Sequence, residues 1–173
     1  MVERRCPECG FDASALPRDQ LPAVVRSNVQ AWLTILAEPA ELLRKSVDNS
    51  RWSPLQYSCH VRDVFRIYHE RLVLMLNEDD PTYPNWDQDR SAVDDHYNDQ
   101  DPAVVASELA AAGEWLAAAF KSVRGATWDR RGSRSDGARF SVDSFGRYMI
   151  HDPVHHLHDV TVDLATLKSS EAP

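Results

Sequence analysis

Residues 53–77 read SPLQYSCHVRDVFRIYHERLVLMLN, and this stretch indicates the fold most clearly. Ser53 can cap a helix, and Pro54 fits the first helical position, where its missing N–H costs nothing. Apolar side chains then recur with a period near 3.6 residues as far as Leu76, which is typical of a helix with one buried face. The stretch therefore predicts a long amphipathic helix that ends near Asn77.

Three further segments repeat this 3.6-residue pattern of apolar side chains. The first spans residues 20–36. The second begins at Asp101, which can cap a helix, and runs to about residue 120 or 123, while the third is capped by Ser141 and reaches Leu167. Almost no hairpin pattern separates these segments. We therefore expect four main helices, no credible strands and an all-α helical bundle.

The connections between these helices differ in length and character. A short helical patch is expected over residues 39–47, and a basic connection with a turn at residues 135–137 occupies residues 124–139. The polar segment 81–100 joins the second and third long helices. A connection this long in a compact domain is usually functional or crosses over between distant elements.

Length and composition limit the class of protein. The chain has 173 residues, which suits one domain, and we expect a short tail over residues 1–12 followed by the bundle over residues 13–173. Acidic residues outnumber basic residues by 27 to 19, so a nucleic acid is a poor partner. The sequence has no run of 18 apolar residues, no secretory signal and no disulfide framework. These features predict a cytoplasmic protein without membrane contact, and its apolar helix faces leave a homodimer open.

The histidines are the unusual part of the composition, because four of the seven lie within residues 151–158. His151 and His155 are four positions apart, so in a helix they project from the same face and can bind one ion. His60 lies beside the buried stripe of the 53–77 helix and could supply a third ligand. Three protein ligands leave coordination positions open, which is typical of catalytic metal sites.

Two features keep other arrangements open. Pro153 lies between the two histidines, removes one backbone hydrogen bond and is expected to kink the helix there. A kink would turn the residues that follow, so His156 or His158 could replace one of the proposed ligands. A histidine-rich helix can also lie on a protein surface without binding a metal.

Residues 52–64, WSPLQYSCHVRDV, together with the later pair His151 and His155, resemble the DinB-like superfamily. The resemblance covers residues 20–168. It implies a DinB-like four-helix bundle of up-down-down-up arrangement, with a long crossover between helices 2 and 3. It also implies a His₃ metal centre with His60, His151 and His155 as the ligands.

The same resemblance implies an activity. The centre would hold a divalent metal (zinc, nickel or iron) and use a low-molecular-weight thiol, so the protein would be a thiol S-transferase or isomerase acting on a small-molecule substrate. The alternative is a non-catalytic, stress-associated bundle that binds a metal or ligand. Members often have Glu where this chain has Gln56. Residues that could support the metal or contact the substrate are Asp63, Trp86, Arg139, Tyr148 and Asp152.

The N-terminal sequence CPECG, from Cys6 to Gly10, is similar to half of a zinc knuckle. A structural zinc normally needs four ligands, and the chain has no second CxxC. The missing ligands could come from Cys59, a nearby histidine or a second chain. Otherwise Cys6 and Cys9 form a free dithiol or redox pair, or belong to an interaction module. Cys59 is either a reactive thiol or a small buried hydrophobic residue.

Overall fold

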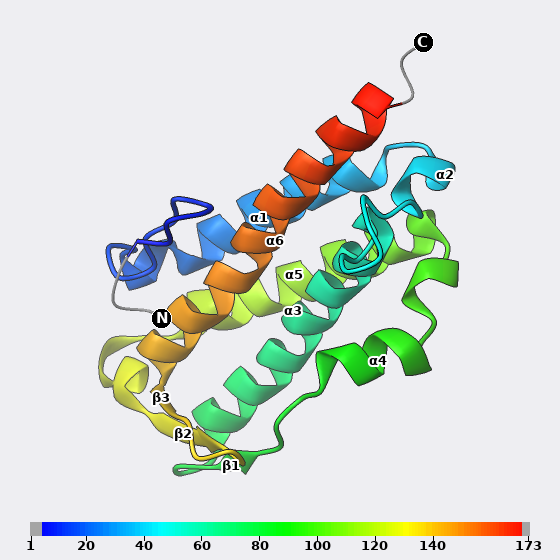
Figure 1. Ribbon diagram of the computed structural model, residues 1–173. Helices are drawn as coiled ribbons and strands as arrows, with labels where there is room; N and C mark the ends of the chain where they lie inside the picture. Colours follow the sequence, from blue (N-terminus) through cyan, green and yellow to red (C-terminus); the bar gives the residue numbers. More distant parts are fainter. Residues whose placement is uncertain (1–4, 171–173) are drawn as a thin grey trace.

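The computed structural model describes residues 5–170, and four long helices dominate it (Figure 1). These are α1 (Leu21–Leu36), α3 (Pro54–Asn77), α5 (Pro102–Ser122) and α6 (Val142–Ser170). The short elements between them are η1 (Arg18–Gln20), α2 (Ala40–Leu43), β1 (Thr82–Tyr83), α4 (Gln88–Asp94), η2 (Tyr97–Asp99), η3 (Gly125–Asp129), β2 (Arg131–Arg134) and β3 (Arg139–Ser141).

The long helices form a ring in which α3 packs against α5 and α6, and α1 packs against the same two helices. α1 and α6 run in one direction, and α3 and α5 run in the other (Figure 1). Because α3 and α5 are consecutive long helices and run parallel, the chain must cross over between them. This crossover contains α4, and α4 lies beside α3. The predicted four-helix bundle with up-down-down-up arrangement is confirmed.

Side-chain caps explain why α3, α5 and α6 begin where they do. The Oγ of Ser53 accepts a hydrogen bond from the backbone N–H of Gln56, and the Gln56 side chain accepts one from the N–H of Ser53. This reciprocal pair is a capping box. Asp101 and Ser141 cap α5 and α6 in the predicted way. Gln56 therefore fixes the first turn of α3.

The expectation of no strands was wrong. A three-stranded sheet has the order β1-β2-β3, with β1 parallel to β2 and β2 antiparallel to β3. The strands are two to four residues long, which is too short for an alternating pattern to be visible in the sequence. The predicted turn at residues 135–137 joins β2 to β3, and Gly137 there has φ +93°. The polar segment 81–100 is likewise more ordered than predicted, because it contains β1, α4 and η2.

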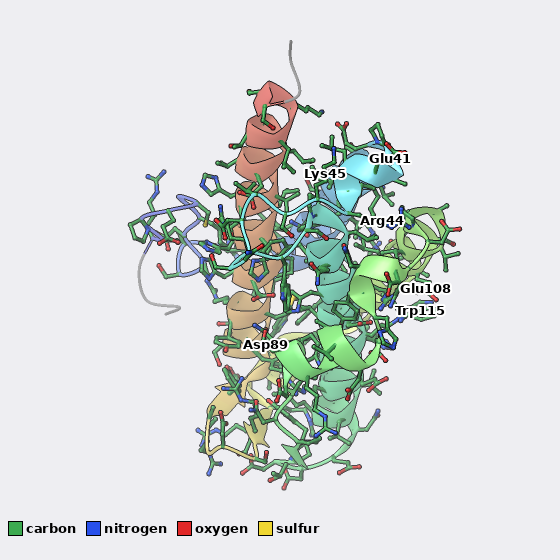
Figure 2. The ribbon with its side chains drawn as sticks, turned by 45° about the vertical axis from the view of Figure 1, so that its right-hand side comes forward. Glu41, Arg44, Lys45, Asp89, Glu108 and Trp115 are labelled. Atoms are coloured by element: carbon green, nitrogen blue, oxygen red, sulfur yellow. The ribbon has the colours of Figure 1, made fainter. Side chains whose placement is uncertain are left out.

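α5 is the most apolar of the long helices. Among the described helices it is the one that length and composition would allow to cross a membrane. In the bundle it packs between α1 and α3, and Leu109, Leu116 and Phe120 are buried there. Figure 2 shows Glu108 and Trp115 on α5 toward the outside of the bundle.

Gly113 allows α5 to approach α1 and α3 closely, and this contact gives a first prediction. A Cβ at this position would collide with Cγ2 of Val29 and lie 3.4 Å from the Phe65 ring. Val29 is buried and, as a β-branched helical residue, has one preferred rotamer. Overpacking costs about 1–3 kcal/mol, and alanine gains about 1 kcal/mol in helix propensity. We therefore expect Gly113→Ala to lower the free energy of unfolding in urea.

The control for this variant uses the same contact. In a Val29→Ala background the collision is absent, so Gly113→Ala should no longer destabilise the protein and should recover the gain in helix propensity. Equal destabilisation in both backgrounds would show that the α1–α5 contact is not the cause.

Candidate metal centres

α6 presents side chains of types that can bind a metal on two neighbouring faces. His151 and His155 form one pair at i and i+4, and Asp152 and His156 form a second pair shifted by one residue. A shift of one residue turns the side chain by about 100° around the helix. The two pairs consequently face different neighbours in the fold.

Pro153 lies inside α6, which continues as a helix from Val142 to Ser170. The carbonyl oxygen of Pro153 accepts hydrogen bonds from Asn28 Nδ2 at 3.2 Å and from Trp32 Nε1 at 3.3 Å. Both donors are buried residues of α1. They hold α6 at the level of the metal-binding side chains and fix its rotation.

The first donor set, which we call the histidine–aspartate site, contains His60, Asp152 and His156. Nε2 of His60 lies 3.0 Å from Oδ2 of Asp152, and Nε2 of His156 lies 3.4 Å from Oδ1 of the same carboxylate. Three ligand atoms lie within 4.8 Å of one another. Ligand bonds of about 2.0–2.2 Å in a tetrahedral site place neighbouring donors roughly 3.4 Å apart. The spacing therefore fits a bound divalent metal.

Aromatic rings surround the histidine–aspartate site. The His60 ring, which is fully buried, stacks on Trp86 at a centroid distance of 5.3 Å and meets the edge of Trp52 at 5.4 Å. Tyr57 lies 4.9 Å from the His156 ring. These rings hold the imidazoles in place and give one side of the site a low-polarity wall.

The charges within the site support one another. Desolvation disfavours the ionised form of Asp152, but hydrogen bonds from His156 and His60 outweigh it and lower the pKa of this carboxyl. Desolvation also opposes protonation of His156, and the bonds to Asp152 and Asp159 outweigh it and raise the pKa of His156. Asp152 is therefore a carboxylate at neutral pH, the form that a metal requires.

A cavity of about 210 Å³ opens beside His60 and Asp152. The guanidinium group of Arg71 lies in its wall, where the side chain is buried and donates to the carbonyl oxygen of Pro84 at 2.8 Å. Among the described residues no carboxylate pairs with Arg71. The other residues of the wall that bear polar groups or rings include Tyr68, Trp86, Arg134, Tyr148 and His151.

The second donor set, which we call the cysteine–histidine site, contains Cys6, Cys9, His151 and His155. Its four donor atoms also lie within 4.8 Å of one another. The backbone N–H groups of Cys9 and Glu8 lower the pKa of the Cys6 thiol, whereas burial raises the pKa of Cys9. In both views the N-terminal loop and α4 lie on opposite sides of α6 (Figures 1 and 2).

The structure thus regroups the residues that the sequence suggested as metal ligands. It brings His60 to Asp152 and His156, and it brings His151 and His155 to the two N-terminal cysteines. The three predicted ligands are not grouped in one set.

The predicted supporting residues also separate into two groups. Asp152, Tyr148 and Trp86 lie at the cavity. Asp63 instead accepts hydrogen bonds from Arg62 and from the hydroxyl of Tyr97 on the other side of α3. Burial alone would raise the pKa of the Asp63 carboxyl. The hydrogen bonds from Arg62 and Tyr97 outweigh burial, so the pKa of Asp63 is lowered.

Two further predicted residues lie away from the donor atoms. Arg139 pairs with Asp80 at 2.6 Å and is exposed. Cys59 is fully buried and directs its sulfur toward the carbonyl oxygen of Tyr97, and burial raises the pKa of its thiol to about 12. Cys59 therefore behaves as a small buried residue.

Sequence reasoning missed Arg71 and Arg134 and left His156 open. The helical wheel gave a usable signal for His156, because it falls nearer the buried residues Met149 and Val160 than His151 or His155 does. Arg71 lies on α3 eleven positions after His60, which places it on nearly the same face of that helix, so the helical wheel carried a signal for it. Arg134 lies on β2, and the pairing that brings it to the cavity is not visible in the sequence.

The fold and the donor sets define a four-helix bundle whose last helix carries side chains that could hold a metal ion. Residues 23–160 match the family model of the DinB superfamily, and the chain belongs to this family. No protein of curated function matches the sequence.

One solved structure is similar over most of the chain. It is YfiT from Bacillus subtilis, described as a probable metal-dependent hydrolase with an unusual four-helix bundle topology. The TM-score is 0.77 at 16% sequence identity, and the match covers 88% of this chain and 87% of YfiT. This likeness shows the shared fold.

Proposed function

We propose that the protein is a metal-dependent enzyme that acts on a small anionic molecule at the histidine–aspartate site. The observation that carries this proposal is the position of three converging donors at the wall of a cavity. His60 and Asp152 line the cavity directly, and His156 completes the set. Three protein ligands leave room for a further ligand, as catalytic metal sites do.

The donor chemistry limits the metal. Two imidazoles and one carboxylate suit zinc, nickel or iron in the divalent state. Such an ion acts as a Lewis acid and lowers the pKa of a bound water or thiol. Asp159 lies 3.4 Å from Nδ1 of His156, which leaves Nε2 of that ring free to face Asp152 and the metal.

Arg71 supports an anionic substrate. It is a buried guanidinium in the cavity wall without a carboxylate partner among the described residues. A buried charge is costly unless it is paired. A carboxylate or phosphate in the cavity would supply the missing partner, and planar guanidinium groups bind both in a bidentate manner.

The bound nucleophile is the finer part of the proposal, and we take it to be a thiol. The family resemblance supports a low-molecular-weight thiol that is transferred to an electrophilic substrate. YfiT, with the same fold, is described as a probable hydrolase, which would use water instead. Trp52 and Trp86 reduce the access of water to His60 from one side, which favours the softer nucleophile.

Cobalt spectroscopy tests the thiol directly. A Cys6→Ser/Cys9→Ser variant loaded with Co²⁺ removes the sulfur ligands of the N-terminal loop. Addition of glutathione should then produce a new sulfur-to-cobalt charge-transfer band, because a thiol enters the histidine–aspartate site. The same variant with Asp152→Ala should show no new band.

Two outcomes would overturn this function. If thiols give no band while the Co²⁺-loaded protein hydrolyses esters or amides, the nucleophile is water. If neither binding nor turnover depends on Asp152, the bundle is the non-catalytic alternative.

A further inference from the structure

We propose that Cys6, Cys9, His151 and His155 form a second metal site, a closed structural zinc site that joins the N-terminal loop to α6. This inference goes beyond the proposed function, because the four donors form a set of their own on the neighbouring face of α6, although His151 also borders the cavity.

The loop has the tight turn that a cysteine knuckle requires. The N–H of Gly10 donates to the carbonyl oxygen of Cys6 at 3.0 Å, and the N–H of Cys6 donates to that of Phe11 at 2.8 Å. Gly10 has φ +72°, a conformation that favours glycine. The turn brings the two sulfurs to the same side of the loop, facing α6.

Each sulfur lies opposite one imidazole of α6. Sγ of Cys6 is 3.8 Å from Nδ1 of His155, and Sγ of Cys9 is 3.7 Å from Nε2 of His151. Zinc bonds of about 2.3 Å to sulfur and about 2.0–2.1 Å to nitrogen place tetrahedral neighbours roughly 3.6 Å apart. The observed separations therefore fit a Cys₂His₂ zinc site.

Neighbouring groups orient both histidines for this role. His155 directs Nδ1 to the sulfur, while its Nε2 lies 3.3 Å from Glu8 and 3.5 Å from Asp159. Carboxylates beside the second ring nitrogen fix the tautomer of a metal-binding histidine. The His151 ring stacks on Phe11 at 6.3 Å and an interplanar angle of 15°.

The number of protein ligands distinguishes the two sites. Four protein donors complete a tetrahedral zinc and leave no position for a substrate, which is the structural type of site. Two thiolates also balance the charge of Zn²⁺. The histidine–aspartate site has three donors and a cavity, which is the catalytic type.

The cysteine–histidine site joins two parts of the fold that are distant in the sequence. It links residues that are 149 and 142 positions apart in the chain. Among the described residues, the other polar contacts between this segment and α6 include the pair of Glu8 with His155 at 3.3 Å and the hydrogen bonds that Arg147 donates to the carbonyl oxygens of Ala13 and Ser14. Metal binding at such a site contributes to folding free energy, so zinc should fasten residues 5–17 to α6.

Metal analysis and cobalt spectroscopy test the site. The wild-type protein should retain zinc in the cysteine–histidine site, and Co²⁺ in its place should give a sulfur-to-cobalt charge-transfer band without added thiol. Cys9→Ser and His151→Ala should each lose that band. The matched control is Cys59→Ala, which removes the third cysteine and should leave the band unchanged.

Hydrogen exchange provides a second readout that does not depend on activity. In Cys9→Ser, exchange at the backbone of residues 10–17 should become faster by about tenfold or more, because the loop opens locally. His156→Ala should leave this exchange unchanged, which separates the zinc site from the proposed catalytic site. The proposal is overturned if Cys9→Ser has the same zinc content and the same cobalt spectrum as the wild-type protein. It is also overturned if the wild-type protein contains no zinc and mass spectrometry finds a disulfide between Cys6 and Cys9.

Discussion

A His156→Ala variant is expected to bind one zinc ion where the wild-type protein binds two. His156 supplies one of the three donors of the histidine–aspartate site and no donor of the cysteine–histidine site. Loss of a residue that only supports a ligand lowers metal affinity about 10- to 100-fold, so loss of the ligand itself should exceed about 100-fold. Competition with a chelator and elemental analysis measure both effects.

Activity should follow the metal. A Lewis-acid metal contributes several kcal/mol to transition-state stabilisation, so turnover should fall about 10²- to 10⁴-fold in His156→Ala. His158→Ala is the matched control, since His158 lies on the same helix with an exposed side chain. If His155→Ala removed the catalytic metal and His156→Ala did not, the set His60, His151 and His155 would be the centre instead.

A Trp32→Ala variant is expected to lose the most stability of any single substitution considered. Trp32 is fully buried in α1, and its indole N–H donates to the carbonyl oxygen of Pro153. Truncation of a buried tryptophan costs about 3–5 kcal/mol. Urea unfolding, with the midpoint and slope compared, measures this loss. Trp115→Ala on the outside of α5, where 58% of the residue is exposed, should change stability by no more than about 0.5 kcal/mol.

Trp32→Phe separates the packing from the hydrogen bond. Phenylalanine keeps most of the buried ring, and Asn28 still donates to the Pro153 carbonyl. The free energy of unfolding should therefore fall by about 1 kcal/mol for the lost hydrogen bond, with a further loss for the smaller ring. A Trp32→Phe variant as unstable as Trp32→Ala would show that the bond to Pro153, and not the packing, dominates.

The long helices could be predicted from the sequence because local signals determine them. Ser53, Asp101 and Ser141 each cap a helix in the predicted way. The three short strands could not be predicted, because β1 and β2 are far apart in the sequence, Thr82 pairing with Ser133, and neither has room for an alternating pattern. Their pairing is a property of the folded bundle.

The grouping of metal donors required the folded structure for a similar reason. The spacing of four positions holds equally for His151 with His155 and for Asp152 with His156, so the sequence does not distinguish the two pairs. The rotation of α6 decides between them, and buried contacts from α1 to Pro153 fix that rotation. The CxxC motif was visible, but its partners lie more than 140 residues away.

The positions of bound zinc distinguish the two possible groupings of the donors on α6. Crystals of the zinc-loaded protein, measured at the zinc absorption edge, should give two anomalous peaks on neighbouring faces of α6. One peak should lie among His60, Asp152 and His156, and the other among the two cysteines with His151 and His155. A single peak coordinated by His60, His151 and His155 would rule out two separate zinc sites.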